Sequence, residues 1–211
     1  MFLGIAVAAV LVASCSPAVE APEPTRTPTR NVFVTPTPVF SDAEMSSLLG
    51  ADFIRPESGF FISYPKAWEY STDPEQGFDA AFRAPVGDHD AGGEVFASIA
   101  VGSDPAPNYT GLPGREYLDN TLTKGVEVLE ASMKDFELIA SYVQKLPSGN
   151  AAVFEYRYTS AEAHRVRGIQ LVIPGPTRLF LFTATALDSA WKAYERTFVA
   201  SAASFTILAG R

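Results

Sequence analysis

Prolines recur between residues 17 and 39 and set the first limit on how this chain folds. They are Pro17, Pro22, Pro24, Pro28, Pro36 and Pro38. Proline fixes φ and lacks a backbone N–H, so neither a helix nor a sheet is expected to propagate through this segment. An extended polyproline II conformation, at about 3.1 Å per residue, is expected instead. The sequence therefore predicts a disordered linker over residues 15–41 and a folded domain over residues 42–211.

An unbroken apolar run precedes the linker. Residues 2–13 read FLGIAVAAVLVA, and Cys15 follows Ser14. The run is shorter than the roughly 20 residues of a transmembrane helix, and it suits the hydrophobic part of a secretory signal. The stretch from Val12 to Cys15 resembles the bacterial lipobox, whose cysteine is acylated and becomes the mature N-terminus.

The sequence therefore predicts a lipoprotein signal peptide over residues 1–14 and a lipidated Cys15. Fatty chains on Cys15, palmitate among them, would hold the chain on the extracytoplasmic face of the cell membrane. The alternative is an ordinary signal peptide with an incidental cysteine. The segment departs from the usual signal in one respect, because no Lys or Arg precedes the apolar run.

Charge and cysteine content limit the class of the domain. The net charge is −8, and the charged residues before position 42 (Glu20, Glu23, Arg26, Arg30) cancel, so the whole excess lies on the domain. An acidic domain is a poor partner for nucleic acid or for an anionic membrane surface. One cysteine allows no internal disulfide, so a hydrophobic core must hold the domain together, and 47% hydrophobic residues supply one.

Hydrophobic periodicity predicts the elements of the domain. Apolar residues at steps of three and four predict a helix through Leu118, Leu122, Val126, Leu129 and Met133, with a bend at Gly125. Ser41 and Glu44 form a capping-box pattern that predicts a short helix over residues 41–50, and Asp188 is expected to cap a helix. Alternating residues predict strands, over 59–65, 78–83, 95–101, 136–146, 151–159, 165–173, 178–185 and 203–208.

Short turns at residues 147–150 and 174–176 separate consecutive strands, which favours an antiparallel meander. The last long helix carries Trp191, Tyr194 and Phe198 on one face, and these rings are expected in the core rather than in a ligand site. Each helix has one apolar face and must cover a sheet. The sequence therefore predicts an α+β domain, an antiparallel sheet flanked by helices.

Three groups of residues resemble the PsbP-like (Mog1/PsbP) superfamily. The opening is Gly59-Phe60, Ile62, Tyr64-Pro65 and Trp68; the middle is the turn 149–151; the close is the run 183–186, then Trp191, Phe198 and the run 203–205. The resemblance covers residues 57–207 and implies an α/β/α sandwich. It also implies protein binding rather than catalysis, since the superfamily contains a photosystem subunit, a Ran-binding protein and bacterial lipoproteins.

Two clusters are candidate binding sites. Asp88, His89, Asp90 and Glu94 lie in a Gly-rich loop and are candidate ligands for a divalent cation, although a solvated loop is the simpler interpretation. Arg157, Arg165 and Arg167 alternate along neighbouring predicted strands and are a candidate patch for an acidic partner. The alternative interpretation is that these arginines lie on a solvated face of the sheet and form salt bridges with neighbouring glutamates.

No catalytic motif appears, and no cofactor is expected. We therefore expect a membrane-anchored lipoprotein that acts as a non-catalytic protein-binding or assembly module, with an unidentified protein or cell-envelope partner and no nucleic acid. A small-ligand or metal carrier is the first alternative, and an exported hydrolase is the second.

Overall fold

The computed structural model describes residues 34–35, 38–73, 77–85, 97–105 and 114–208. Three helices lie among them, α1 (Asp42–Leu48), α2 (Arg115–Ser132) and α3 (Trp191–Ser204). The strands are β1 (Val34–Thr35), β2 (Gly50–Arg55), β3 (Phe60–Pro65), β4 (Glu69–Ser71), β5 (Ala80–Arg83), β6 (Ser98–Pro105), β7 (Lys134–Leu146), β8 (Gly149–Thr159), β9 (Arg165–Pro174), β10 (Arg178–Leu187) and β11 (Thr206–Ile207).

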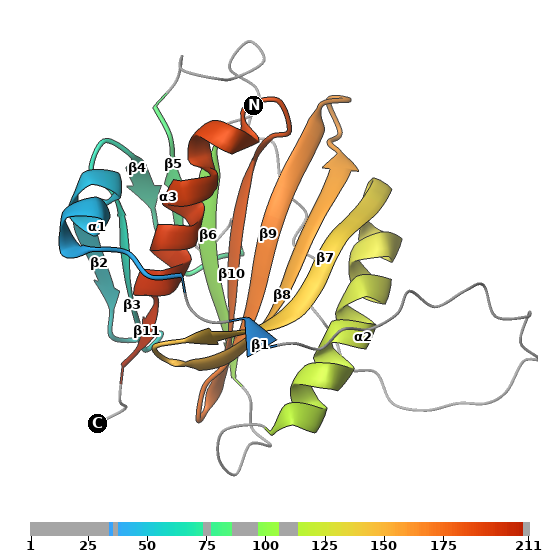
Figure 1. The fold of residues 1–211 in the computed structure, drawn as a ribbon, viewed down its shortest axis with the longest axis horizontal. Helices are drawn as coiled ribbons and strands as arrows, with labels where there is room; N and C mark the ends of the chain where they lie inside the picture. The colour runs from blue at the N-terminus through green and yellow to red at the C-terminus, as the bar shows by residue number, and fades with distance from the viewer. Residues whose placement is uncertain (1–33, 36–37, 74–76, 86–96, 106–113, 209–211) are drawn as a thin grey trace, which may run out of the picture.

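The strands form two sheets. The larger has eight strands in the order β1-β7-β8-β9-β10-β6-β5-β4, and the smaller has the order β11-β3-β2. Strands β7 to β10 are consecutive antiparallel neighbours, so the predicted meander is confirmed. Figure 1 shows α3 on one face of the large sheet and α2 at its β7–β8 end. The α+β prediction is therefore confirmed, with helices on both faces.

One core lies between the large sheet, α3 and the small sheet. Phe60 of β3, Phe82 of β5, Phe182 of β10 and Phe198 of α3 are each 0% exposed in it. Trp191 lies in the same core, and the predicted stripe of rings is therefore part of the core. One side of the small sheet packs against these rings. Strands β2 and β3 therefore cover part of the large sheet, together with α3.

A second, smaller core lies under α2. Leu118, Leu122 and Leu129 of the helix pack on Phe154 and Tyr156 of β8. A bend at Gly125 stays a prediction, and the structure shows that this glycine has a packing role. A Cβ at position 125 would lie 2.4 Å from Cζ of Phe154, so only glycine lets the helix approach the ring.

Several boundaries differ from the sequence prediction. Val34 and Thr35 form β1, which pairs in parallel with β7, although both lie inside the predicted linker. Strand β6 runs to Pro105, and α3 runs to Ser204 where a strand was expected. Strands β2 and β4 were not predicted, because β2 lies at the edge of the small sheet and β4 has three residues.

Two predicted helix caps have different outcomes. The capping box of Ser41 and Glu44 is confirmed, since the Glu44 N–H donates to the Ser41 hydroxyl and the Ser41 N–H donates to the Glu44 carboxylate. Asp188 does not cap α3, whose N-cap is Ala190. The Asp188 carboxylate accepts instead from Arg157, and a half-buried guanidinium is the stronger partner for it.

Candidate partner-binding surface

Helix α3 leaves part of its own side of the large sheet uncovered, over β7, β8 and β9 (Figure 1). Charged side chains occupy this part and its border, and we call them the polar face. They are Glu137, Glu155, Arg157, Arg165 and Arg167 on the strands and Asp188 and Glu195 beside them. Strand register brings them together, because Arg157 is opposite both Glu137 of β7 and Arg167 of β9.

Arg157 and Arg165 are joined by one carboxylate. Arg157 donates from Nη1 to Glu137 at 3.1 Å and from Nε to Asp188 at 2.9 Å. Arg165 donates to the other oxygen of Glu137 at 2.6 Å and to the backbone carbonyl of Asp135 at 2.7 Å. The hydrogen bond to Asp188 is the main cause that raises the pKa of Arg157. Both guanidinium groups are therefore held in place from within the chain.

Arg167 is arranged differently. Its guanidinium lies over the ring of Trp191, 4.8 Å from the ring centre. Its Nη2 is 3.3 Å from Glu155 and 3.7 Å from Glu195. The Tyr142 hydroxyl donates to the other oxygen of Glu155 at 2.9 Å. Burial, followed by the charge of Glu155, raises the pKa of Tyr142, so this hydroxyl stays protonated.

The structure brings the predicted arginines Arg157, Arg165 and Arg167 to one face, but not as a free basic patch. Carboxylates lie beside each of them, in agreement with the ion-paired alternative. Three guanidinium groups face four carboxylates, so the polar face carries a slight negative excess. Partner recognition by these arginines stays a prediction.

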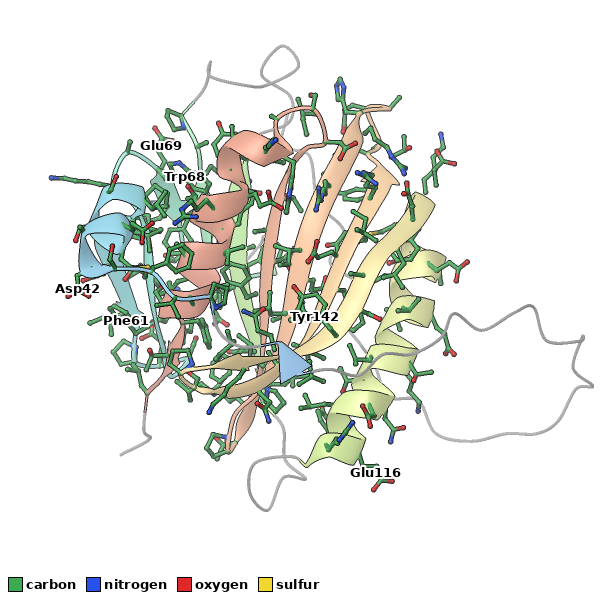
Figure 2. All side chains as sticks on the ribbon, in the orientation of Figure 1. Asp42, Phe61, Trp68, Glu69, Glu116 and Tyr142 are labelled. Atoms are coloured by element: carbon green, nitrogen blue, oxygen red, sulfur yellow. The ribbon has the colours of Figure 1, made fainter. Side chains whose placement is uncertain are left out.

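Sequence reasoning missed the rest of the polar face. The alternation of Glu155 with Arg157 along β8 was a usable signal for one carboxylate. Glu195, on α3, and Asp188, before that helix, join the face only through tertiary packing. Tyr142 was missed because it is opposite Val153 and reaches Glu155 diagonally across the strand pair, a contact that no local pattern marks. Figure 2 places Tyr142 on β7, in the part of the sheet that α3 leaves open.

The other predicted sites lie elsewhere. Cys15 and the candidate ligands Asp88, His89, Asp90 and Glu94 are outside the described residues, so they stay predictions. Among the residues that the structure does describe, no three His, Cys, Asp or Glu side chains gather as a metal site. None of the helices in that part of the chain is long and apolar enough to cross a membrane.

Known structures share this fold at low sequence identity. The PsbP of the cyanobacterium Synechocystis (CyanoP) superposes with a TM-score of 0.53 at 18% identity, covering 74% of this chain and 91% of CyanoP. LpqN of Mycobacterium tuberculosis, described as involved in cell envelope biogenesis, gives a TM-score of 0.53 at 13% identity, covering 71% of this chain and 83% of LpqN. No curated protein matches the chain significantly.

The sequence profile of the PsbP family matches residues 51–207. This match extends from β2 to β11 and includes every strand that contributes to the polar face. It agrees with the resemblance seen in the opening, middle and closing motifs of the sequence. The chain belongs to the PsbP family.

Proposed function

We propose that this chain is a membrane-anchored extracytoplasmic lipoprotein whose PsbP domain binds a partner protein through the polar face, without catalysis. The observation that carries the proposal is the polar face itself. Side chains such as Arg157 and Glu137 are 30% and 52% exposed, and they are fixed in position by one another. Fixed and exposed charged groups suit recognition, because little side-chain entropy is lost when a partner docks.

Family membership supports the non-catalytic part of the proposal. The PsbP resemblance implies protein binding rather than a reaction, and LpqN, which shares the fold, is described as involved in cell envelope biogenesis. In the described part of this chain the clearest arrangement of polar groups is a set of ion pairs, not a nucleophile held beside a base. Ion pairs of this kind give specificity and a fast association rate rather than chemistry.

The anchor is tested at Cys15. Full-length protein expressed in a bacterial host with lipoprotein processing should be found in the membrane fraction, with an acylated cysteine at the mature N-terminus by mass spectrometry. The variant Cys15→Ser should lose the acyl groups and leave the membrane fraction after cleavage by signal peptidase. An unmodified thiol in the mature wild-type protein would refute the anchor.

The binding surface is tested by site-specific photocrosslinking in intact cells. A photoreactive residue at Ala140, which is opposite Glu155 in the β7–β8 register, samples the polar face. A matched probe at the exposed Lys124 of α2 samples the other side of the sheet. We expect a discrete protein adduct from position 140 and none from position 124. Equal adducts from both positions, or from neither, would contradict the proposed surface.

A further inference from the structure

The arginines of the polar face differ in how well their donors are satisfied. Arg157 and Arg165 each donate from two nitrogens at 2.6 to 3.1 Å. Arg167 uses one nitrogen, at 3.3 Å from Glu155 and 3.7 Å from Glu195. Charge-assisted N–H to carboxylate bonds usually measure about 2.7–2.9 Å. Arg167 is therefore the guanidinium of this face with unused capacity for an oxygen acceptor.

Two buried donors meet at this point. Nε of Arg167 and Nε1 of Trp191 are both buried, and neither has an acceptor among the described residues. Trp191 is only 3% exposed, and its ring lies 4.8 Å from the carbon of the Arg167 guanidinium. Buried N–H groups without an acceptor are rare, because each costs the desolvation of a polar group. Two neighbouring residues therefore each carry a buried donor that lacks an acceptor within the described part of the chain.

The two carboxylates beside Arg167 are held with different strength. Glu155 has one oxygen on Arg167 and accepts from the Tyr142 hydroxyl with the other, and its side chain is 21% exposed. Glu195 lies at the longer distance, and its side chain is 48% exposed. An exposed ion pair at 3.7 Å contributes little free energy. Glu195 is therefore the carboxylate that another one can replace.

We propose that Arg167 and Trp191 form a carboxylate-binding position, where an acidic side chain of the partner protein displaces Glu195 and accepts hydrogen bonds from both residues. The proposal deepens the proposed function, on which it rests. Because Glu195 returns to water as the partner carboxylate enters, the number of negative charges around Arg167 does not change.

The test measures the indole N–H of Trp191 by NMR in the 15N-labelled full-length chain. The probes are a triglutamate peptide with blocked ends and the matched triglutamine peptide. The chain has two tryptophans, and the indole of Trp68, which packs on Tyr194 and Phe198, is the internal control. We expect triglutamate to shift the Trp191 resonance in a saturable way, triglutamine to leave it unchanged, and Trp68 to stay in place.

Substitutions of Arg167 and of Glu195 should change the affinity for triglutamate in opposite directions. Arg167→Gln should weaken triglutamate binding at least about tenfold, since a hydrogen-bonded charge is lost. Arg167→Lys keeps the charge but removes the Nε donor, and it should weaken binding less. Glu195→Gln removes the competing carboxylate and should tighten binding by about threefold. The matched control Arg115→Gln should leave the affinity unchanged, because Arg115 lies on α2, on the other side of the sheet, and its side chain is 73% exposed.

The tightening by Glu195→Gln is the decisive result, because a purely structural role for Glu195 does not produce it, and this exposed substitution does not threaten the fold. Weaker binding in Glu195→Gln, or an equal shift of Trp191 with both peptides, would overturn the proposal. A photocrosslinked partner that still binds the Arg167→Gln variant normally would overturn it too, while the proposed function stands.

Discussion

Strand β8 separates two surfaces that are built in opposite ways. On the α2 side it presents Ala152, Phe154 and Tyr156, which are at most 1% exposed. On the other side its last residues include Glu155 and Arg157, which are partly exposed and ion-paired. The α2 side is thus held by close packing, and the polar face is held by charges in contact with water.

The difference indicates what each surface contributes. Buried rings dominate stability, because a fully buried side chain contributes several kcal/mol in total through transfer and packing. Exposed ion pairs contribute about 0–1 kcal/mol each. The polar face is therefore not required for folding, and its ordered arrangement is better explained by recognition. Substitutions on the two surfaces test this division.

The largest effect is expected from Phe154→Ala. Phe154 is 0% exposed and lies under α2, so its removal leaves a cavity between helix and sheet. We expect a loss of about 3–5 kcal/mol in the free energy of unfolding, measured by urea denaturation. The comparison fails if the loss is no larger than that of a substitution on the polar face, because α2 would then not depend on this ring.

The next effect concerns the glycine that faces the same ring. In Gly125→Ala the new Cβ would lie 2.4 Å from Cζ of Phe154, so the helix or the ring must shift. Overpacking of this kind costs about 1–3 kcal/mol, even though alanine favours a helix. Thermal and urea unfolding of the variant measure the change.

A second variant isolates the cause. Leucine at position 154 lacks the Cζ atom, so Gly125→Ala made in a Phe154→Leu background should no longer destabilise the protein. The higher helix propensity of alanine should then give a gain of up to about 1 kcal/mol. If Gly125→Ala is equally harmful in both backgrounds, contact with Phe154 is not the reason for the glycine.

The fold was predictable where a periodic pattern runs through a long element. The steps through Leu118, Leu122 and Leu129 gave α2, and the alternating strands β7 to β10 gave the meander. Strand β1 was missed because a pair of residues shows no period, and prolines on both sides favour a linker. Local patterns therefore predicted the elements that bury a continuous apolar face, and they missed the short strands at the edges of the sheets.

The polar face was only partly predictable. Alternation alone put Arg165 and Arg167 on one side of a strand. Their carboxylate partners come from β7, β8 and the start of α3, and sequence alone does not give the register between strands. Asp188 shows the same limit, because a helix-capping residue and an ion-pair partner have the same local signal. Ion pairs between residues that are distant in the sequence could therefore be identified only from the structure.

A smaller effect is expected on the polar face itself. Tyr142→Phe removes the hydroxyl that donates to Glu155 and leaves the ring in place. We expect a loss of about 0.5–1.5 kcal/mol in the free energy of unfolding. The matched control Tyr70→Phe alters a ring that is 58% exposed, and it should change stability by less than about 0.5 kcal/mol. A loss as large as that of Phe154→Ala would show that the polar face is essential to folding after all.

The smallest effect is expected at an exposed ion pair outside both surfaces. Glu44 accepts from Ser41 and from Arg196, and the hydrogen bond from the Ser41 backbone is the main cause that lowers its pKa below the usual 4.5. A lowered pKa in the folded state stabilises the protein above pH 4.5, and this contribution is lost as the pH falls through the lower folded value. Wild type and Glu44→Gln should therefore differ in stability at pH 7 and converge in acid, as measured by thermal unfolding at each pH. Because the Glu44 side chain is 44% exposed, the difference should be small. Curves that stay parallel down to acid pH would show that its charge does not contribute to folding.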